Sequence, residues 1–247
     1  MDIASLLIVL FAFAFAGTVK GFIGVGLPSI SIAILSSFMP LTTAIQIMVV
    51  PGFCANLWQA LDGRHFIALI KRLWIFLVAN MLAAWLAYRY VLFEYPREMT
   101  ILLAVLLCLY AIGGLGFKLP GLKAGNEKFL GPLFGGATGF FAGTTGNTTM
   151  PSIAYLESLR LDRNEMVQAM GLTFGAPLFV IALVAFEPQS SWNSVSWIAV
   201  LALLPTFAGM WLGRMFRHRI SEQLFRKLLF IALLFIGIRL LVVNCNW

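Results

Sequence analysis

Long apolar runs alternate with short polar turns along nearly the whole chain. Runs of this length and hydrophobicity are typical of helices that cross a lipid bilayer. The pattern therefore predicts an all-α polytopic membrane protein. Long helices are expected at about Ile3–Ile23, Thr42–Leu61, a segment that ends at about Tyr90, Thr100–Phe117, Phe129–Gly143, Glu165–Phe186, Trp192–Met215 and Leu224–Val243.

Two further apolar segments are too short to cross the bilayer. They lie at about Pro28–Met39 and Pro151–Leu159. At 1.5 Å per residue, each covers only about half of the ~30 Å hydrocarbon core. Each follows a long apolar run and a glycine-rich turn, which predicts a broken or re-entrant helical hairpin in each half of the chain.

The glycine-rich turns belong to two copies of one pattern. Both copies read Gly-x3-Gly-x2-Gly followed by Pro-Ser-Ile, and they begin at Gly17 and Gly139, so that 139 − 17 = 122. A Gln-x-Met pair recurs at Gln46 and Gln168 with the same offset, since 168 − 46 = 122. We infer an internal repeat of about five segments per copy. The copies are expected to span residues 1–120 and 121–247 and to form one transport domain.

Composition supports a membrane location. The chain is 61% hydrophobic and 11% charged, so membrane lipid must contact much of its surface. The net charge of +7 is spread over short basic patches between apolar runs. This placement favours loops beside a membrane over a nucleic-acid surface, and we expect no nucleic-acid partner.

The basic loops of one half correspond to non-basic loops of the other half, which predicts two repeats of inverted orientation. By the positive-inside rule, both termini are expected outside. Ile3–Ala16 imitates a secretory signal, but it lacks a basic start, and a retained first helix is the expected alternative. The loops expected inside are 64–72, 118–128, 160–163 and 214–227.

Few residues are available for catalysis or for holding a cofactor. The three cysteines have no metal-ligand spacing, and neither His65 nor His218 has a second ligand at helical spacing. The spans contain no His/Cys/Asp/Glu constellation, and no Gly-x4-Gly-Lys-Ser/Thr motif for ATP occurs. We therefore expect no metal, no cofactor and no enzymatic activity.

The two hairpin apices are the predicted binding site. Pro28 and Pro151 favour helix starts, where unpaired amides and a partial positive charge suit an anion. Glycines in the turns allow an anion to approach the backbone, and hydroxyl and amide side chains supply donors. The predicted substrate-binding residues are Gly24, Gly26, Pro28, Ser29, Gln46, Gly143, Thr144, Thr145, Gly146, Asn147, Thr148, Thr149, Pro151, Ser152 and Gln168.

Several of these residues have a structural alternative. Small residues also allow close helix–helix packing in membranes, and a buried glutamine such as Gln46 or Gln168 can simply tie helices together. Lys20 is either a counter-charge for the substrate or a side chain that snorkels to the cytoplasmic face, and we expect snorkelling. Glu157 is either a proton carrier or a hydrated residue at a short helix end, and hydration is the expected state.

The doubled glycine-rich turn with its proline, the Thr/Asn-rich second copy and the inverted halves resemble the sulfite exporter TauE/SafE family of membrane permeases. The resemblance covers essentially the whole chain. It implies a transporter in a bacterial plasma membrane that exports, or in some members takes up, small anions such as sulfite, sulfoacetate or thiosulfate. The first copy lacks the Thr and Asn residues of the second copy.

The sequence thus predicts a secondary transporter that binds a small anion at paired helix breaks and works by alternating access. An anion channel remains the alternative, because inverted repeats with midplane breaks serve both classes. An integral membrane enzyme is the less favoured third class. The exact substrate, a proton or sodium coupling ion and the oligomeric state are not encoded in any motif that we recognise.

Overall fold

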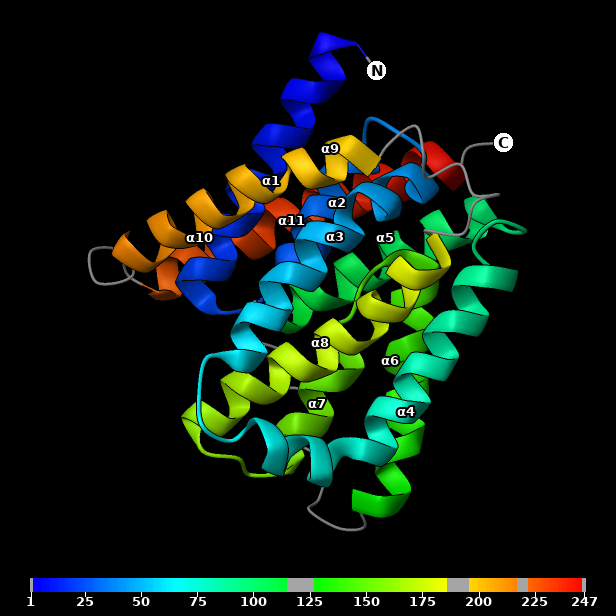
Figure 1. Ribbon diagram of the computed structural model, residues 1–247. Helices are drawn as coiled ribbons and strands as arrows, with labels where there is room; N and C mark the ends of the chain where they lie inside the picture. The colour runs from blue at the N-terminus through cyan, green and yellow to red at the C-terminus, as the bar shows by residue number, and fades with distance from the viewer. Residues whose placement is uncertain (1, 115–126, 186–195, 217–221, 246–247) are drawn as a thin grey trace.

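The computed structural model describes residues 2–114, 127–185, 196–216 and 222–245, and the only regular elements among them are helices. Two of the helices, α2 and α7, are much shorter than most of the others (Figure 1). Their bounds are α1 Ile3–Ile23, α2 Leu27–Leu35, α3 Leu41–Leu61, α4 Phe66–Tyr90, α5 Pro96–Gly114, α6 Glu127–Thr145, α7 Met150–Ser158, α8 Arg163–Ala185, α9 Ser196–Leu201, α10 Leu203–Phe216 and α11 Glu222–Cys245.

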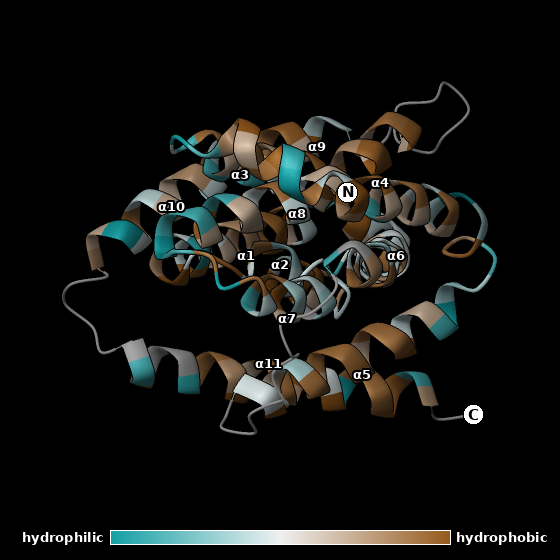
Figure 2. Cartoon of the chain, turned by 90° about the horizontal axis from the view of Figure 1, so that it is seen from below, coloured by the Kyte–Doolittle hydropathy of each residue, from teal (hydrophilic) through white to brown (hydrophobic). Residues whose placement is uncertain are grey.

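The described chain is a multi-pass membrane protein with seven candidate spans, judged by length and composition. Large apolar side chains remain exposed along these helices, as expected where lipid covers them. In Figure 2, α2 and α7 lie in the middle, with the α5–α11 pair along one side. The candidate spans are α1, α3, α4, α5, α8, the stretch Ser196–Phe216 and Lys227–Cys245.

The two short helices confirm the predicted breaks in the chain. Gly24 ends α1 in the left-handed region, with φ 92° and its amide bonded to Lys20 O at 2.7 Å. Gly146 ends α6 in the same way, with φ 69° and its amide bonded to Ala142 O at 2.9 Å. Left-handed backbone favours glycine, and it stops a helix within one residue. After each turn, a nine-residue helix begins with proline in its first turn.

One predicted helix is observed as two consecutive helices that together form one candidate span. The sequence predicted Trp192–Met215, of which 192–195 lies outside the described residues, whereas the structure divides the described part at Ala202 into α9 and α10. Pro205 has no amide hydrogen to donate to Leu201 O, four residues earlier, so the helix is interrupted there. The predicted loop at 118–128 lies almost entirely outside the described residues, and its last two residues, Glu127 and Lys128, belong to α6.

The long helices pair across the two halves of the chain. Helix α1 packs against α10, and α6 packs against α4, while α3 pairs with α8 and α5 with α11. Glycines make the first two contacts close, because a Cβ atom at these positions would meet the backbone of the partner helix. The four contacts are Gly17 with Thr206, Gly21 with Met210, Gly139 with Asn80 and Gly143 with Ala84.

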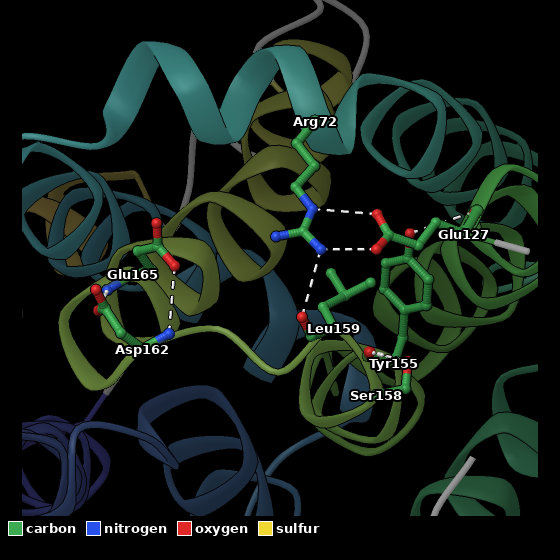
Figure 3. Close-up of polar contacts among 7 residues, drawn as sticks. All are labelled: Arg72, Glu127, Tyr155, Ser158, Leu159, Asp162 and Glu165. Atoms are coloured by element: carbon green, nitrogen blue, oxygen red, sulfur yellow. Dashed lines mark hydrogen bonds and ion pairs between the residues drawn. The ribbon is translucent and has the colours of Figure 1, made fainter. Parts of the chain in front are cut away.

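A network of charged side chains joins the helix ends on one face. Arg72 Nη2 and Nε donate to the Glu127 carboxylate at 2.6 and 3.1 Å, and Nη2 also donates to Leu159 O at 3.3 Å (Figure 3). These bonds join the second turn of α4 and the first residue of α6 to the end of α7. Arg214 Nη2 lies 3.8 Å from Asp62 Oδ2, which brings the ends of α10 and α3 together. We call this surface the basic face.

A second set of contacts joins the opposite helix ends. Arg97 donates through Nε and Nη2 to Asn244 O at 3.1 and 2.8 Å, which joins the start of α5 to the end of α11. Arg239 Nη1 donates to Ser37 O at 3.3 Å, which adds the turn after α2. Helix α3 runs from this end, at Leu41, to the basic face, at Leu61.

Candidate functional site

The starts of α2 and α7 meet in a buried cluster of hydrogen bonds. Thr149 Oγ1 donates to Asn147 Oδ1 at 2.9 Å. The Ser29 hydroxyl lies 2.8 Å from Thr149 Oγ1 and 3.3 Å from Asn147 Oδ1. The structure therefore brings the two predicted apices into direct contact, although Ser29 and Asn147 are 118 residues apart.

The Asn147 amide has a fixed orientation within this cluster. Its Oδ1 also accepts the Thr149 backbone N–H at 3.0 Å. A backbone N–H can only donate, so the atom that faces Thr149 must be the amide oxygen. The Nδ2 group therefore points away from these donors.

Two buried polar atoms at this site have no hydrogen-bond partner among the described residues. They are Asn147 Nδ2 and Thr148 Oγ1, on side chains whose residues are 1% and 0% exposed. A buried polar atom without a partner costs free energy, about 1–3 kcal/mol. Both atoms can donate hydrogen bonds, so their natural partner is an acceptor that is not part of the protein.

The backbone adds further donors at the same place. The amide of Ile30 donates to Gly26 O at 2.9 Å, and the amide of Ile153 donates to Thr149 O at 3.1 Å. Amides that precede these in α2 and α7 have no carbonyl four residues back within the helix. The two helix starts each contribute a partial positive charge of about half a unit. The cluster is thus a neutral site with a positive potential, which suits a small anion.

The other predicted hydroxyl groups are already used inside the protein. Thr144 and Thr145 donate to Phe140 O and Phe141 O at 2.8 and 2.7 Å. Ser152 donates to Thr148 O, within its own helix turn. These residues position the backbone around the site, and the free donors are Asn147 and Thr148.

Gly143 has a packing role. It lies inside α6, where a Cβ atom would meet Ala84 O and the Tyr88 amide of α4. The left-handed conformations are found instead at Gly24, Gly26 and Gly146.

The glutamines tie helices together in this structure. Gln168 Nε2 donates to Ala60 O at 2.8 Å, and its Oε1 accepts the His65 amide at 2.9 Å. It therefore joins α8 to the turn between α3 and α4. Gln46 is buried and hydrogen-bonds with Tyr88, which joins α3 to α4. Glu157 is exposed, in agreement with the expected hydrated state.

The expectation that Lys20 snorkels to the surface is wrong. Lys20 is only 3% exposed, and its Nζ donates to Asn56 Oδ1 at 2.7 Å and to Gln59 Oε1 at 2.6 Å. Sequence reasoning missed Asn56 and Gln59, since their distance from Lys20 along the chain gives no local pattern. One signal could have found them: Asn56 and Gln59 are two amide residues at i and i+3 in the otherwise apolar helix α3, so their side chains lie on the same face of the helix.

A cavity of about 180 Å³ lies at the far end of α2. Its polar lining comes from Ser36, Ser37, Thr100, Arg239 and Asn244. No residue of the apex cluster lines it, so it is separate from the candidate site. No group of His, Cys, Asp and Glu residues in the described part of the chain could hold a metal ion.

The fold and the cluster define a multi-pass, all-helical membrane protein built around two half-length helices whose starts meet at buried donors. Residues 9–240 match the family model for the sulfite exporter TauE/SafE, so the chain belongs to this family. The family consists of transporters rather than enzymes, as the sequence predicted for this chain. Comparison with curated proteins and with solved structures gave no match.

Proposed function

We propose that this chain is a secondary transporter that exports a small sulfur-containing anion, such as sulfite, sulfoacetate or thiosulfate, across the plasma membrane of a bacterium. The observation that supports the site is the pair of unpartnered buried donors, Asn147 Nδ2 and Thr148 Oγ1, at the meeting of two helix starts. Family membership supports the class of substrate.

The charge of the site supports selectivity for anions. Two helix starts together approximate one positive charge, and the donors around them carry no formal charge. An anion with several acceptor oxygens can bind the two side chains and the helix amides together. A cation or an amine would leave these donors unpaired, which costs about 1–3 kcal/mol for each buried group.

The pairing of helices supports the proposal that the halves are related as repeats. If each helix is replaced by its counterpart in the other half, the α1–α10 contact becomes the α6–α4 contact. The glycines agree, because Gly17 and Gly139 face α10 and α4, and their numbers differ by the repeat offset of 122. In the α3–α8 pair and in the α5–α11 pair, each helix contacts its own counterpart, so the same replacement leaves these pairs unchanged. Many transporters that work by alternating access are built from two related halves around one site.

The inverted orientation of the halves can be tested by cysteine labelling. We propose that both termini lie outside and that the basic face lies inside. After replacement of the native cysteines, Glu94→Cys and Trp197→Cys should react with an impermeant reagent from outside, and Asn164→Cys and Met215→Cys only from inside. Labelling of Trp197→Cys and Met215→Cys from the same side would exclude this orientation.

Transport itself can be tested with the purified protein in liposomes. A carrier should exchange sulfite or thiosulfate with a rate that saturates, and it should give no single-channel current. Discrete currents carried by the same anions would show that the chain is a channel. If neither anion crosses, nor sulfoacetate, the proposed substrate class is wrong.

A further inference from the structure

Lys20 is a buried basic side chain that pairs with no acidic side chain among the described residues. No carboxylate of the described residues forms an ion pair with it, and its two partners, Asn56 Oδ1 and Gln59 Oε1, are neutral amide oxygens. A charged side chain inside a membrane protein is costly, and it usually marks the path of a substrate or an ion. The missing counter-charge is therefore the first indication of a ligand.

The same place holds a second unpartnered donor. Asn56 is fully buried, and its Nδ2 has no hydrogen-bond partner, while its Oδ1 is held by Lys20. Gln59 differs, because its Nε2 has a partner and donates to Val167 O at 2.9 Å. An ammonium with three donors, two of them used, and a free amide N–H group can together bind one anion.

The turn that follows Lys20 borders open space. Gly24 lies one turn after Lys20, and its amide bonds to Lys20 O. A Cβ atom built on Gly24 would meet no atom within 4 Å. Gly24 has left-handed backbone, with φ 92°, and because it is a glycine it places no side chain on this side of the turn. Open space therefore lies beside the turn that directly follows the helical turn of Lys20.

The position of this cluster along α3 separates it from the central site. Gly146 packs near Met48, whereas Lys20 binds Asn56, eight residues nearer the basic face. Eight residues of helix correspond to about 12 Å. An anion drawn toward the basic face would therefore reach Lys20 before it reaches Asn147.

We propose that Lys20 and Asn56, with Gln59 holding the ammonium in place, form a second anion-binding position between the basic face and the central site. This inference rests on the proposed function. In the absence of an anion, the Lys20 ammonium is held by the two amide oxygens. An arriving anion supplies the missing negative charge and accepts hydrogen bonds from the third ammonium N–H and from Asn56 Nδ2.

The test is the number of thiosulfate ions bound per chain, measured by equilibrium dialysis of radiolabelled thiosulfate with the full-length protein in detergent. The inference predicts two ions for the wild type and one for Asn147→Leu. It also predicts one for Asn56→Asp, because the new carboxylate keeps the size of Asn56 and neutralises Lys20 from within. Asn164→Asp, which adds the same charge at an exposed position, should still bind two.

The possible results separate this inference from the proposed function. One ion bound by the wild type and none by Asn147→Leu would overturn the second position and keep the central site. One ion bound by the wild type, kept by Asn147→Leu and lost in Asn56→Asp, would overturn the central site. No thiosulfate bound by the wild type would overturn both. Since the wild-type stoichiometry decides between one and two positions, the test does not depend on the folding of any variant.

Discussion

The two apices share a backbone conformation but carry different side chains. Gly24 and Gly146 each end a long helix in the left-handed region, and a nine-residue helix with proline in its first turn follows. The first apex is Gly-Val-Gly-Leu before its proline, with Ser29 as its one hydroxyl side chain, whereas the second has Asn147, Thr148 and Thr149. The shared part ends a long helix and starts a short one, and the polar side chains are the part that differs.

The first half contains a buried basic residue that the second half lacks. Lys20 has Ala142 at the equivalent position, since 20 + 122 = 142. The second apex thus contributes neutral donors, and the first half contributes a buried cation toward the basic face. The two halves therefore differ in the polar side chains that they place near the apices.

The largest expected difference between the apices comes from Asn147→Leu compared with Val25→Leu, at the equivalent position. Removing the amide leaves the Thr149 N–H and the Thr149 hydroxyl without their acceptor and deletes the free Nδ2 donor. At about 1–3 kcal/mol for each buried group, transport should fall by about 100-fold or more. Val25 has an apolar side chain, and its replacement should change the initial rate of thiosulfate transport less than about twofold.

Equal rates for the two variants, at equal amounts of folded protein, would mean that the apices do not differ in function. The amount of folded protein is measured by size-exclusion chromatography in detergent.

The next effect concerns stability and compares Gly146→Ala with Gly24→Ala. Both residues have left-handed backbone, and alanine there should cost about 1–2 kcal/mol. A Cβ atom at Gly146 would also collide with Ile32 and lie 3.3 Å from Ile45, whereas Gly24 borders open space. Overpacking should add about 1–3 kcal/mol at Gly146. Thermal unfolding in detergent should show the lower midpoint for Gly146→Ala.

A second substitution sharpens this comparison. Ile32→Val removes the methyl group that a Cβ atom at Gly146 would meet. It should therefore recover part of the lost stability in Gly146→Ala and none in Gly24→Ala. No recovery in Gly146→Ala would show that the backbone conformation alone accounts for its loss.

The smallest effect distinguishes two threonines of the second half. Thr148→Val removes a hydroxyl that has no partner in the protein, so stability should not fall, while the apparent affinity for the anion should weaken by about 1–2 kcal/mol, or about 5–30-fold in KM. Thr144 uses its hydroxyl within α6, and Thr144→Val should leave KM within about twofold of wild type. The same KM for both variants would remove Thr148 from the site.

The sequence predicted most of the fold because its breaks are local. Pro28 and Pro151 with the preceding glycines identified both short helices, and apolar length identified the long ones. The division between α9 and α10 was missed because a single proline within an apolar run, Pro205, can also be accommodated in a membrane helix without a break. The glycine repeat contained two roles that sequence alone did not separate: Gly143 packs against α4, and Gly146 ends α6.

The site was predicted less completely than the fold. The polar residues near each apex could be named from the sequence. Hydrogen-bond geometry decides which of their donors stay free, and the sequence does not show that the Thr144 donor is used while the Asn147 donor is free. The burial of Lys20 was missed because its partners lie 36 and 39 residues away on another helix. Burial of a lysine is a property of tertiary packing, and the snorkelling rule describes only side chains that can reach the surface.

The central claim is that an anion binds at Asn147, between the two helix starts, and Asn147→Asp tests it most directly. The carboxylate keeps the oxygen that accepts from Thr149, and it replaces the free Nδ2 donor with negative charge. Asn164→Asp supplies the same change of charge at an exposed position. We predict that Asn147→Asp folds and yet shows no saturable sulfite transport in liposomes, while Asn164→Asp transports like the wild type. Wild-type KM and rate in folded Asn147→Asp would contradict the account.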